Sequence, residues 1–70
     1  IVLDVRTKEE FEEGHLPNAL NINVLDSANF IQQIQLLNKR KNYVVYCRSG
    51  KRSVKASELL AGSQFKHIYN

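Results

Sequence analysis

Four short strand-like runs divide this chain, and their spacing limits its fold more than any other feature of the sequence. The runs cover residues 1–5, 19–24, 43–47 and 65–69 and are rich in the β-branched, aliphatic and aromatic residues that favour strands. The segments between them are long enough for crossover helices, which parallel strands require. We therefore predict the α/β class, with a mainly parallel sheet and helices on both of its faces.

Helix signals occupy each of the three intervening segments. Thr7 and Glu10 fit a capping box, and Gly14 is suited to end that helix in a left-handed conformation. Either Asp26 or Ser27 can cap a second helix. Its apolar side chains recur at helical spacing: Phe30, Ile31, Ile34 and Leu37. A third helix is predicted from about residue 53 to residue 62, with an apolar face of Ala56, Leu59 and Leu60.

The length and the apolar content of 43% fit a single domain over residues 1–70. Its core must be small, and a single cysteine allows no internal disulfide to reinforce it. The chain opens on an apolar run without Met and closes directly after another, so we expect a fragment of a longer protein. No apolar stretch approaches the roughly 20 residues that span a bilayer. An unpaired cysteine favours a reducing compartment, so we expect a cytoplasmic protein with no membrane partner.

Charge is distributed unevenly along the chain. Residues 1–26 carry two basic and six acidic side chains, whereas residues 27–70 carry eight basic and one acidic side chain. Three of the basic residues, Arg48, Lys51 and Arg52, follow within five residues of Cys47. We interpret the basic residues at positions 39–41 as solvated charge in a turn. Because aromatic residues are not interleaved with the basic ones, no nucleic-acid partner is predicted.

Cys47 ends the strongest strand-like run, and ligands of open α/β sheets bind beyond the carboxyl ends of the strands. Gly50 can take the positive φ that turns the backbone N–H groups of the following loop inward. A helix then begins at once, so its positive end points to the same space. Helix N-termini and neighbouring cations lower the pKa of a cysteine. We therefore predict a thiolate nucleophile at Cys47.

The other side chains of this loop add hydrogen-bond donors and positive charge. We expect the hydroxyls of Ser49 and Ser53 to donate to a bound anion. We expect the three loop cations to face the mouth of the site and to attract a dianionic substrate: Arg48, Lys51 and Arg52. An isolated free cysteine at the end of a strand is more often an inert, buried side chain. Its place inside a cationic loop is therefore what favours chemistry.

Two separate stretches of the chain resemble the rhodanese family. The first resembles the N-terminal signature of that family and consists of Asp4-Val5-Arg6, Glu10-Phe11, Gly14-His15, Pro17, Ala19 and Asn21. The second resembles its active-site loop and runs from Tyr46 to Ser53. Asn18 stands where the family usually has Gly, and Asn tolerates the left-handed geometry next best. We expect the given sequence to lack the outermost N- and C-terminal elements of the family.

The resemblance implies a three-layer architecture and a sulfurtransferase that uses no cofactor. Cys47 would take a sulfane sulfur from a small anionic donor such as thiosulfate and hold it as a persulfide. The acceptor would be cyanide or a thiol, including a protein such as a thioredoxin-like reductant. The resemblance also implies that Asp4 and Arg6 organise the pocket. An ion pair that links the first strand to its neighbours explains these two residues equally well.

Two other functions remain open from the sequence. Rhodanese-like modules also serve as docking or regulatory domains without catalysis, although the retained Cys47 argues against that role here. Cysteine phosphatases use a loop of Cys, five residues and Arg, in which the Arg binds phosphate. In this chain Ser53 occupies that place, Arg52 comes one position early, and Tyr46 replaces the usual His. We therefore rank a phosphatase below a sulfurtransferase.

No metal site is predicted, because one cysteine and two distant histidines offer no ligand spacing. We expect His15 to form a buried hydrogen bond near the turn between Gly14 and Pro17. His67 lies in the last strand-like run and has no signal of a partner.

Overall fold

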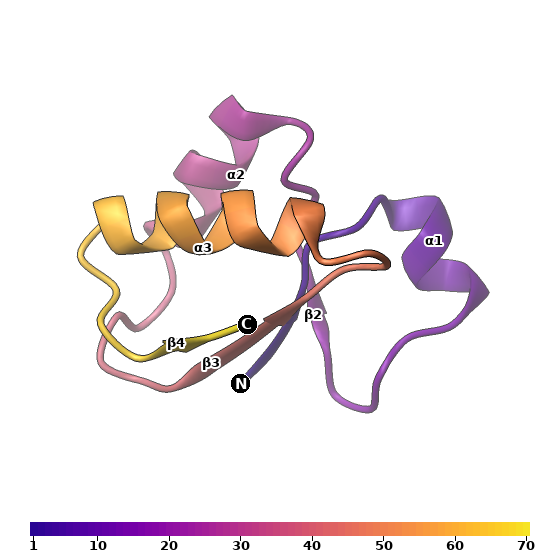
Figure 1. Cartoon of the computed structure of the whole chain (residues 1–70), viewed down its shortest axis with the longest axis horizontal. Coiled ribbons are helices and arrows are strands. Elements are labelled where there is room, and N and C mark those ends of the chain that lie inside the picture. Colours follow the sequence, from indigo (N-terminus) through magenta and orange to yellow (C-terminus); the bar gives the residue numbers. More distant parts are fainter.

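The computed structural model describes residues 1–70 and contains one all-parallel sheet with three helices (Figure 1). In chain order the elements are β1 (Val2–Asp4), α1 (Lys8–Glu13), β2 (Leu20–Asn21), α2 (Ser27–Ile34), β3 (Tyr43–Tyr46), α3 (Lys51–Gly62) and β4 (Ile68–Tyr69). The strands lie side by side in the order β2-β1-β3-β4, and every neighbouring pair is parallel. The predicted α/β class is confirmed. No helix combines the length and apolar character that a membrane crossing requires.

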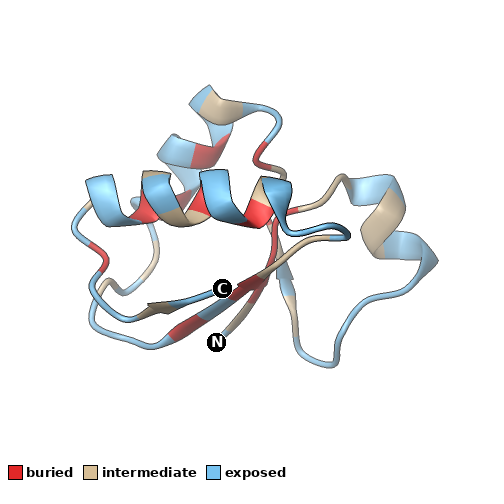
Figure 2. Ribbon diagram, viewed as in Figure 1, coloured by how far each residue is buried: buried red, intermediate tan, exposed pale blue.

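The two faces of the sheet are covered unequally. Both α2 and α3 lie over the same face, whereas α1 lies beyond the carboxyl ends of the strands (Figure 1). Tyr43 and Val45 point toward the covered face and are buried, but Val44 between them is 46% exposed. α1 is acidic along most of its length and buries no residue (Figure 2). The coverage that we expected on both faces therefore comes mainly from α2 and α3 on one of them.

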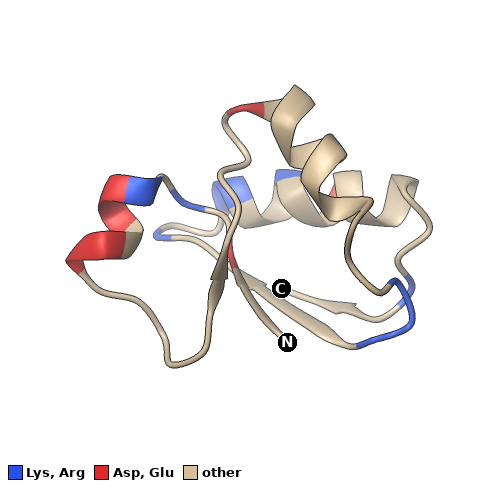
Figure 3. Cartoon of the chain, turned by 180° about the vertical axis from the view of Figure 1, so that it is seen from behind, with Lys and Arg blue, Asp and Glu red and all other residues tan.

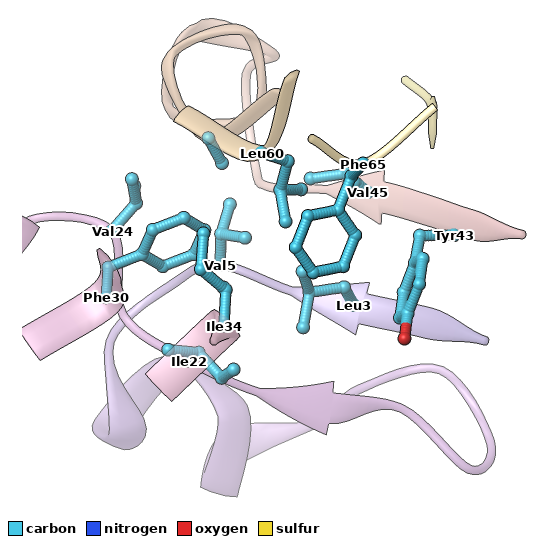
Figure 4. Close-up of a cluster of buried hydrophobic side chains, with 11 residues drawn as sticks. Leu3, Val5, Ile22, Val24, Phe30, Ile34, Tyr43, Val45, Leu60 and Phe65 are labelled. Carbon is cyan, nitrogen blue, oxygen red and sulfur yellow. The ribbon is translucent and has the colours of Figure 1, made fainter. Parts of the chain in front are cut away.

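The core fills the space between the covered face and these two helices (Figure 4). It contains the buried residues Leu3, Val5, Ile22, Val24, Phe30, Ile34, Tyr43, Val45, Ala56, Leu60 and Phe65. Full burial of one such large side chain contributes about 1.5–3 kcal/mol. The prediction of which residues form the apolar face of α2 is correct for Phe30 and Ile34 but not for the other two. Ile31 is 41% exposed, and Leu37 follows the helix end and packs at the margin of the core.

Local signals place most of the helix ends. Thr7 and Glu10 form the predicted capping box, and Asp26, not Ser27, caps α2 by accepting from the N–H of Asn29. Gly14 ends α1 with φ 156° and ψ 141°, which is not the left-handed helical conformation that we expected.

All four predicted strands are longer than the observed ones, and the difference is largest for β2 and β4. β2 is limited to Leu20–Asn21, although the N–H groups of Ile22 and Val24 still bond to carbonyl groups at the end of the first strand and beyond. β4 is limited to Ile68–Tyr69, because the chain before it turns inward and buries Phe65 in the core. α3 begins two residues earlier than predicted, at Lys51.

Candidate active site

Cys47 lies immediately after β3, at the carboxyl edge of the sheet, and its side chain is partly buried. The backbone N–H groups of Gly50 and Ser53 donate to its Sγ atom over 3.1 Å and 3.3 Å. The loop between β3 and α3 therefore turns its N–H groups toward the sulfur, as the sequence predicts. Hydrogen bonds of this kind favour the thiolate over the thiol.

The sulfur takes the place that a capping side chain usually fills at the start of α3. Gly50 is the N-cap residue of this helix and has no side chain to accept from its first N–H groups. It adopts φ 91° and ψ −14°, a left-handed conformation that glycine reaches without steric cost. Ser53 is the third residue of the helix, and a capping side chain normally receives the N–H of that position. The positive end of α3 is therefore directed at Cys47.

Two opposing effects set the pKa of the Cys47 thiol. Burial acts to raise this pKa, but hydrogen bonds from the Ser53 hydroxyl and from the N–H groups of Ser53, Gly50 and Ser49 outweigh it. The net result is a pKa below the ordinary value of a thiol. The Ser53 hydroxyl has a single hydrogen and also lies 3.0 Å from the carbonyl oxygen of Gly50, so its rotation decides which partner it serves.

A buried polar network lies beneath this loop, around Asp4. The carboxylate of Asp4 is fully buried and accepts the guanidinium of Arg6, whose closest contact is 2.7 Å from Nη2 to Oδ2. Burial acts to raise the pKa of Asp4, but the hydrogen bonds from Arg6 and Tyr46 hold it below its ordinary value. Arg6 also donates from Nη2 to the carbonyl oxygen of Gly14. Asp4 and Arg6 thus tie the end of β1 to the end of α1 across the site.

Tyr46 also belongs to this network, a role that the sequence did not predict, although it placed Tyr46 at the start of the loop. Its hydroxyl donates to Oδ2 of Asp4 over 2.6 Å and accepts from the N–H of Leu16 over 3.2 Å. Its ring lies 5.6 Å from the guanidinium carbon of Arg6. Tyr46 directly precedes Cys47, so these contacts fix the backbone from which the Cys47 side chain projects.

We predicted that Arg52 would face the mouth of the site as a free cation, but it is paired with a carboxylate. Its guanidinium forms two hydrogen bonds with the carboxylate of Glu10, over 2.6 Å and 3.0 Å. Glu10 also accepts from the N–H of Thr7, and these contacts lower its pKa to about 2, with the bond to Arg52 contributing most. The expectation failed because α1 brings a carboxylate over the first turn of α3. Arg52 therefore joins α1 to α3.

The side chains of Arg48 and Lys51 are exposed and form no ion pair or hydrogen bond. Arg48 borders a polar hollow between the loop and α1, which is also lined by Arg6, Glu10, Glu13 and Gly14. Lys51 borders a shallower hollow on the other side of the loop, together with Ser49, Gly50, Val54 and Asn70. The basic loop and the acidic α1 thus lie next to each other (Figure 3). Free positive charge near Cys47 comes from Arg48 and Lys51.

Neither histidine takes part in this arrangement. His15 bonds through Nδ1 to the carbonyl oxygen of Phe11 over 2.8 Å and stacks on its ring, with 3.6 Å between the ring centres. The predicted hydrogen bond is present, but His15 is exposed and not buried, because the turn after α1 projects from the domain. His67 is exposed beside β4. The structure brings together no group of three or more His, Cys, Asp or Glu side chains that could hold a metal ion.

The sequence of this chain is similar to a family of known proteins and to several of its relatives. The family model described as Rhodanese-like domain matches residues 1–70. The chain is 38% identical to tRNA uridine(34) hydroxylase of Buchnera aphidicola subsp. Schizaphis graminum, over 100% of this chain and 23% of that protein. It is 34% identical to Thiosulfate sulfurtransferase 18 of Arabidopsis thaliana, over 97% of this chain and 58% of that protein.

A solved structure described as rhodanese with anions from E. coli has the same fold. It superposes with a TM-score of 0.84 at 28% identity, over 99% of this chain and 80% of that chain. The present chain spans less than two thirds of the length of either sequence relative.

Proposed function

This chain belongs to the rhodanese-like domain family, and we propose that it transfers a sulfane sulfur through a persulfide on Cys47. The observation that carries the proposal is the pair of backbone N–H groups, from Gly50 and Ser53, that converge on Sγ at the start of α3. They favour a thiolate, which is the nucleophilic form of cysteine. The resemblance of the chain to a protein named thiosulfate sulfurtransferase supports thiosulfate as the donor.

The reaction needs no external oxidant or reductant. The Cys47 thiolate attacks the outer sulfur of thiosulfate and forms an S–S bond with it. The bond between the two sulfur atoms of thiosulfate breaks, and its electron pair leaves with sulfite. The acceptor, cyanide or a thiolate, then attacks the terminal sulfur of the persulfide. The electron pair of the protein S–S bond returns to Cys47, which becomes a thiolate again.

The surrounding residues bind and orient in this scheme. The N–H groups of Gly50 and Ser53 stabilise negative charge on the sulfur before attack and when the acceptor removes the sulfane sulfur. The free charges of Arg48 and Lys51 attract a dianionic donor from solution. The network of Asp4, Arg6 and Tyr46 holds the strand end rigid and does no chemistry.

The geometry disfavours phosphatase activity. A phosphatase of this loop type needs a guanidinium that faces the bound phosphate. Arg52 is the arginine whose position in the sequence comes nearest to that of the phosphatase Arg. Its Nη1 and Nη2 atoms both donate to the carboxylate of Glu10. Ser53 is the sixth residue after Cys47, the place where the phosphatase loop has its Arg. The N–H of Ser53 already bonds to the Cys47 sulfur. A loop closed this tightly fits a single sulfur atom better than a tetrahedral phosphate.

The test is a thiosulfate and cyanide assay on the purified chain, with Cys47→Ser as the variant and Lys41→Ala as a matched surface control. We expect the wild type and Lys41→Ala to produce thiocyanate and Cys47→Ser to produce none. After thiosulfate alone, the intact mass should rise by about 32 Da, one sulfur atom held as a persulfide. A folded protein with neither product nor added mass would instead be a docking module. Release of phenol from an aryl phosphate would support the phosphatase.

A further inference from the structure

A third hollow lies beside the first turns of α3, and of its lining residues the mechanism above uses only Lys51. The chain that leads into α2 passes beside the start of α3 and forms one wall (Figure 1). The first two turns of α3 form the other wall. The lining residues are Val24, Leu25, Ser27, Lys51, Arg52 and Lys55. The hollow therefore combines an apolar wall with a basic one.

The basic wall is not neutralised by the chain itself. Lys51 and Lys55 lie four residues apart on α3, are both exposed and form no ion pair or hydrogen bond. Like charges at this spacing destabilise a helix slightly. Arg52 is the only lining cation with a partner, and that partner, Glu10, belongs to α1. No acidic side chain lines the hollow, so the charge is available to a negatively charged partner.

The apolar wall is exposed to an extent that suits a protein partner. Leu25, which lines this hollow, is 64% exposed. Val54 lies on α3 between Lys51 and Lys55, borders the neighbouring hollow that Lys51 also lines, and is 49% exposed. Exposed apolar side chains within a polar rim are typical of protein-binding patches. No aromatic side chain lines the hollow, so it offers no platform on which nucleic-acid bases could stack. These features favour an acidic protein surface over RNA.

The hollow is also close to the reactive sulfur. Its basic wall includes Lys51 and Arg52, which lie between Gly50 and Ser53 in the turn that holds Sγ. A partner seated on this wall would therefore bring its own side chains next to a persulfide on Cys47.

We propose that the surface formed by Leu25, Lys51, Val54 and Lys55 docks the sulfur acceptor, and that this acceptor is a protein with acidic and aliphatic residues beside its reactive cysteine. The inference rests on the proposed function, since it names the acceptor class of that reaction. Acidic residues of the acceptor pair with the two lysines, and its aliphatic residue covers Leu25. The acceptor thiolate then attacks the terminal sulfur of the Cys47 persulfide and forms an S–S bond with it. The S–S bond to Cys47 breaks, its electron pair returns to Cys47 as a thiolate, and the acceptor leaves as a persulfide.

The first experiment measures how fast acceptor peptides discharge the persulfide. Three short peptides each contain one cysteine and one leucine, flanked by two Asp, two Asn or two Lys residues. The protein is loaded with thiosulfate, freed of donor and mixed with each peptide, and the loss of the added sulfur is followed by intact mass. We expect the acidic peptide to react about fivefold faster than its Asn counterpart, and this preference to shrink in high salt.

Two variants outside the Cys47 loop test whether this surface causes the preference. Lys55→Glu should abolish the preference for the acidic peptide, and Leu25→Ser should slow the acidic and Asn peptides alike, about threefold. Lys66→Glu is the matched control and should change neither rate. Discharge by cyanide, which is too small to contact the surface, should be unchanged in all three variants. Equal rates for the acidic and Asn peptides, or a preference that survives Lys55→Glu, would refute the docking proposal.

The second experiment does not depend on chemistry at Cys47. The acidic peptide, with Ser in place of its cysteine, is titrated into ¹⁵N-labelled protein, and amide shifts should concentrate at residues 25–27 and 51–55. If no persulfide forms but these shifts appear, the proposed function fails and the surface remains an acidic-peptide site. If a persulfide forms but the peptide does not bind, only the docking inference fails. Shifts produced by a tRNA and not by the peptide would show an RNA interface instead.

Discussion

The two helices that flank the Cys47 loop are attached to the domain in different ways. α3 buries Ser53, Ala56 and Leu60 against the sheet, whereas α1 buries no residue at all. α1 is held instead by polar contacts, chiefly the ion pair of Glu10 with Arg52, in which both side chains remain about one fifth exposed. The helix whose first N–H groups bond to the Cys47 sulfur is therefore held by the core. The helix that places carboxylates beside them depends on a solvent-screened ion pair.

This difference predicts that one set of residues determines the stability of the fold and another set determines the activity. Residues on the α3 side and beneath it should affect folding when they are altered, because they are buried or bonded to buried groups. Residues that face the hollow between α1 and the loop should affect activity more than folding. Four measurements test that division, beginning with the largest effect.

Asp4→Asn should cause the largest loss of stability. The substitution leaves Arg6 and Tyr46 facing a neutral amide in a buried position. Removing one partner of a buried ion pair costs about 3 kcal/mol, the lower end of the known range, because Arg6 retains some access to solvent. A domain of this size has a total stability of about 4–10 kcal/mol. Urea unfolding measures the change directly.

Asp26→Ala provides the comparison for Asp4. It removes an exposed capping bond to the N–H of Asn29 and should cost about 1 kcal/mol. Similar losses for the two variants would mean that the Asp4 network is no more important to folding than an ordinary helix cap.

Arg48→Ala should lower kcat/KM for thiosulfate at least about tenfold while the urea midpoint stays nearly constant. Arg48 is exposed, unpaired and next to Cys47, and loss of one charged hydrogen bond to a donor costs about 1.5–3 kcal/mol. Lys41→Ala is the control, since Lys41 is exposed in the turn before β3. Lys39 is unsuitable, because its Nζ bonds to Gln35 and lies 5.9 Å from the centre of the Phe65 ring. Equal small effects at positions 48 and 41 would leave only backbone groups to act on the donor.

The pH dependence of Cys47 alkylation tests whether the hydrogen bonds from the start of α3 lower the pKa of its thiol. Iodoacetamide alkylation of the folded protein should have a midpoint below that of the urea-unfolded chain, whose thiol has a pKa of about 8.5. A lowered pKa in the folded state also stabilises the fold. This contribution is complete above about pH 8.5 and is lost as the pH falls through the lowered pKa. The wild type should therefore gain stability relative to Cys47→Ala as the pH rises through this window; a flat difference would contradict the capping role of the sulfur.

The smallest effect is expected at the ion pair of α1. Glu10→Gln and Arg52→Ala should each lower kcat/KM only severalfold, and the double variant should resemble either single one, because both remove the same link. The pKa of Glu10 is lowered to about 2, so its contribution to stability is present above its ordinary pKa and lost as the pH falls toward 2. Amide shifts of residues 8–13, followed from pH 5 to pH 2, would detect the release of α1. Additive effects in the double variant would show that the two residues act independently.

The features that the sequence predicts well are those set by neighbours along the chain. The capping box of Thr7 and Glu10 lies within one helical turn, and the positive φ of Gly50 follows from the lack of a side chain. Cys47 could be placed at a strand end because the run before it has no residue that breaks a strand. These local preferences are enough to order the elements and to identify the loop that surrounds the sulfur.

Only the tertiary structure decided which groups meet across the site. Arg52 pairs with Glu10, and Tyr46 bonds to Asp4, in each case over 42 positions of the chain. Ile31 has the spacing of a core residue but is exposed, because α2 turns that side to solvent. The sequence by itself was enough to place Cys47 at the end of β3, to identify the loop that follows it and to predict the helix after that loop. Packing determined which cations of that loop are neutralised. Arg52 meets Glu10 only when the sheet and helices are assembled, because the two residues lie far apart along the chain.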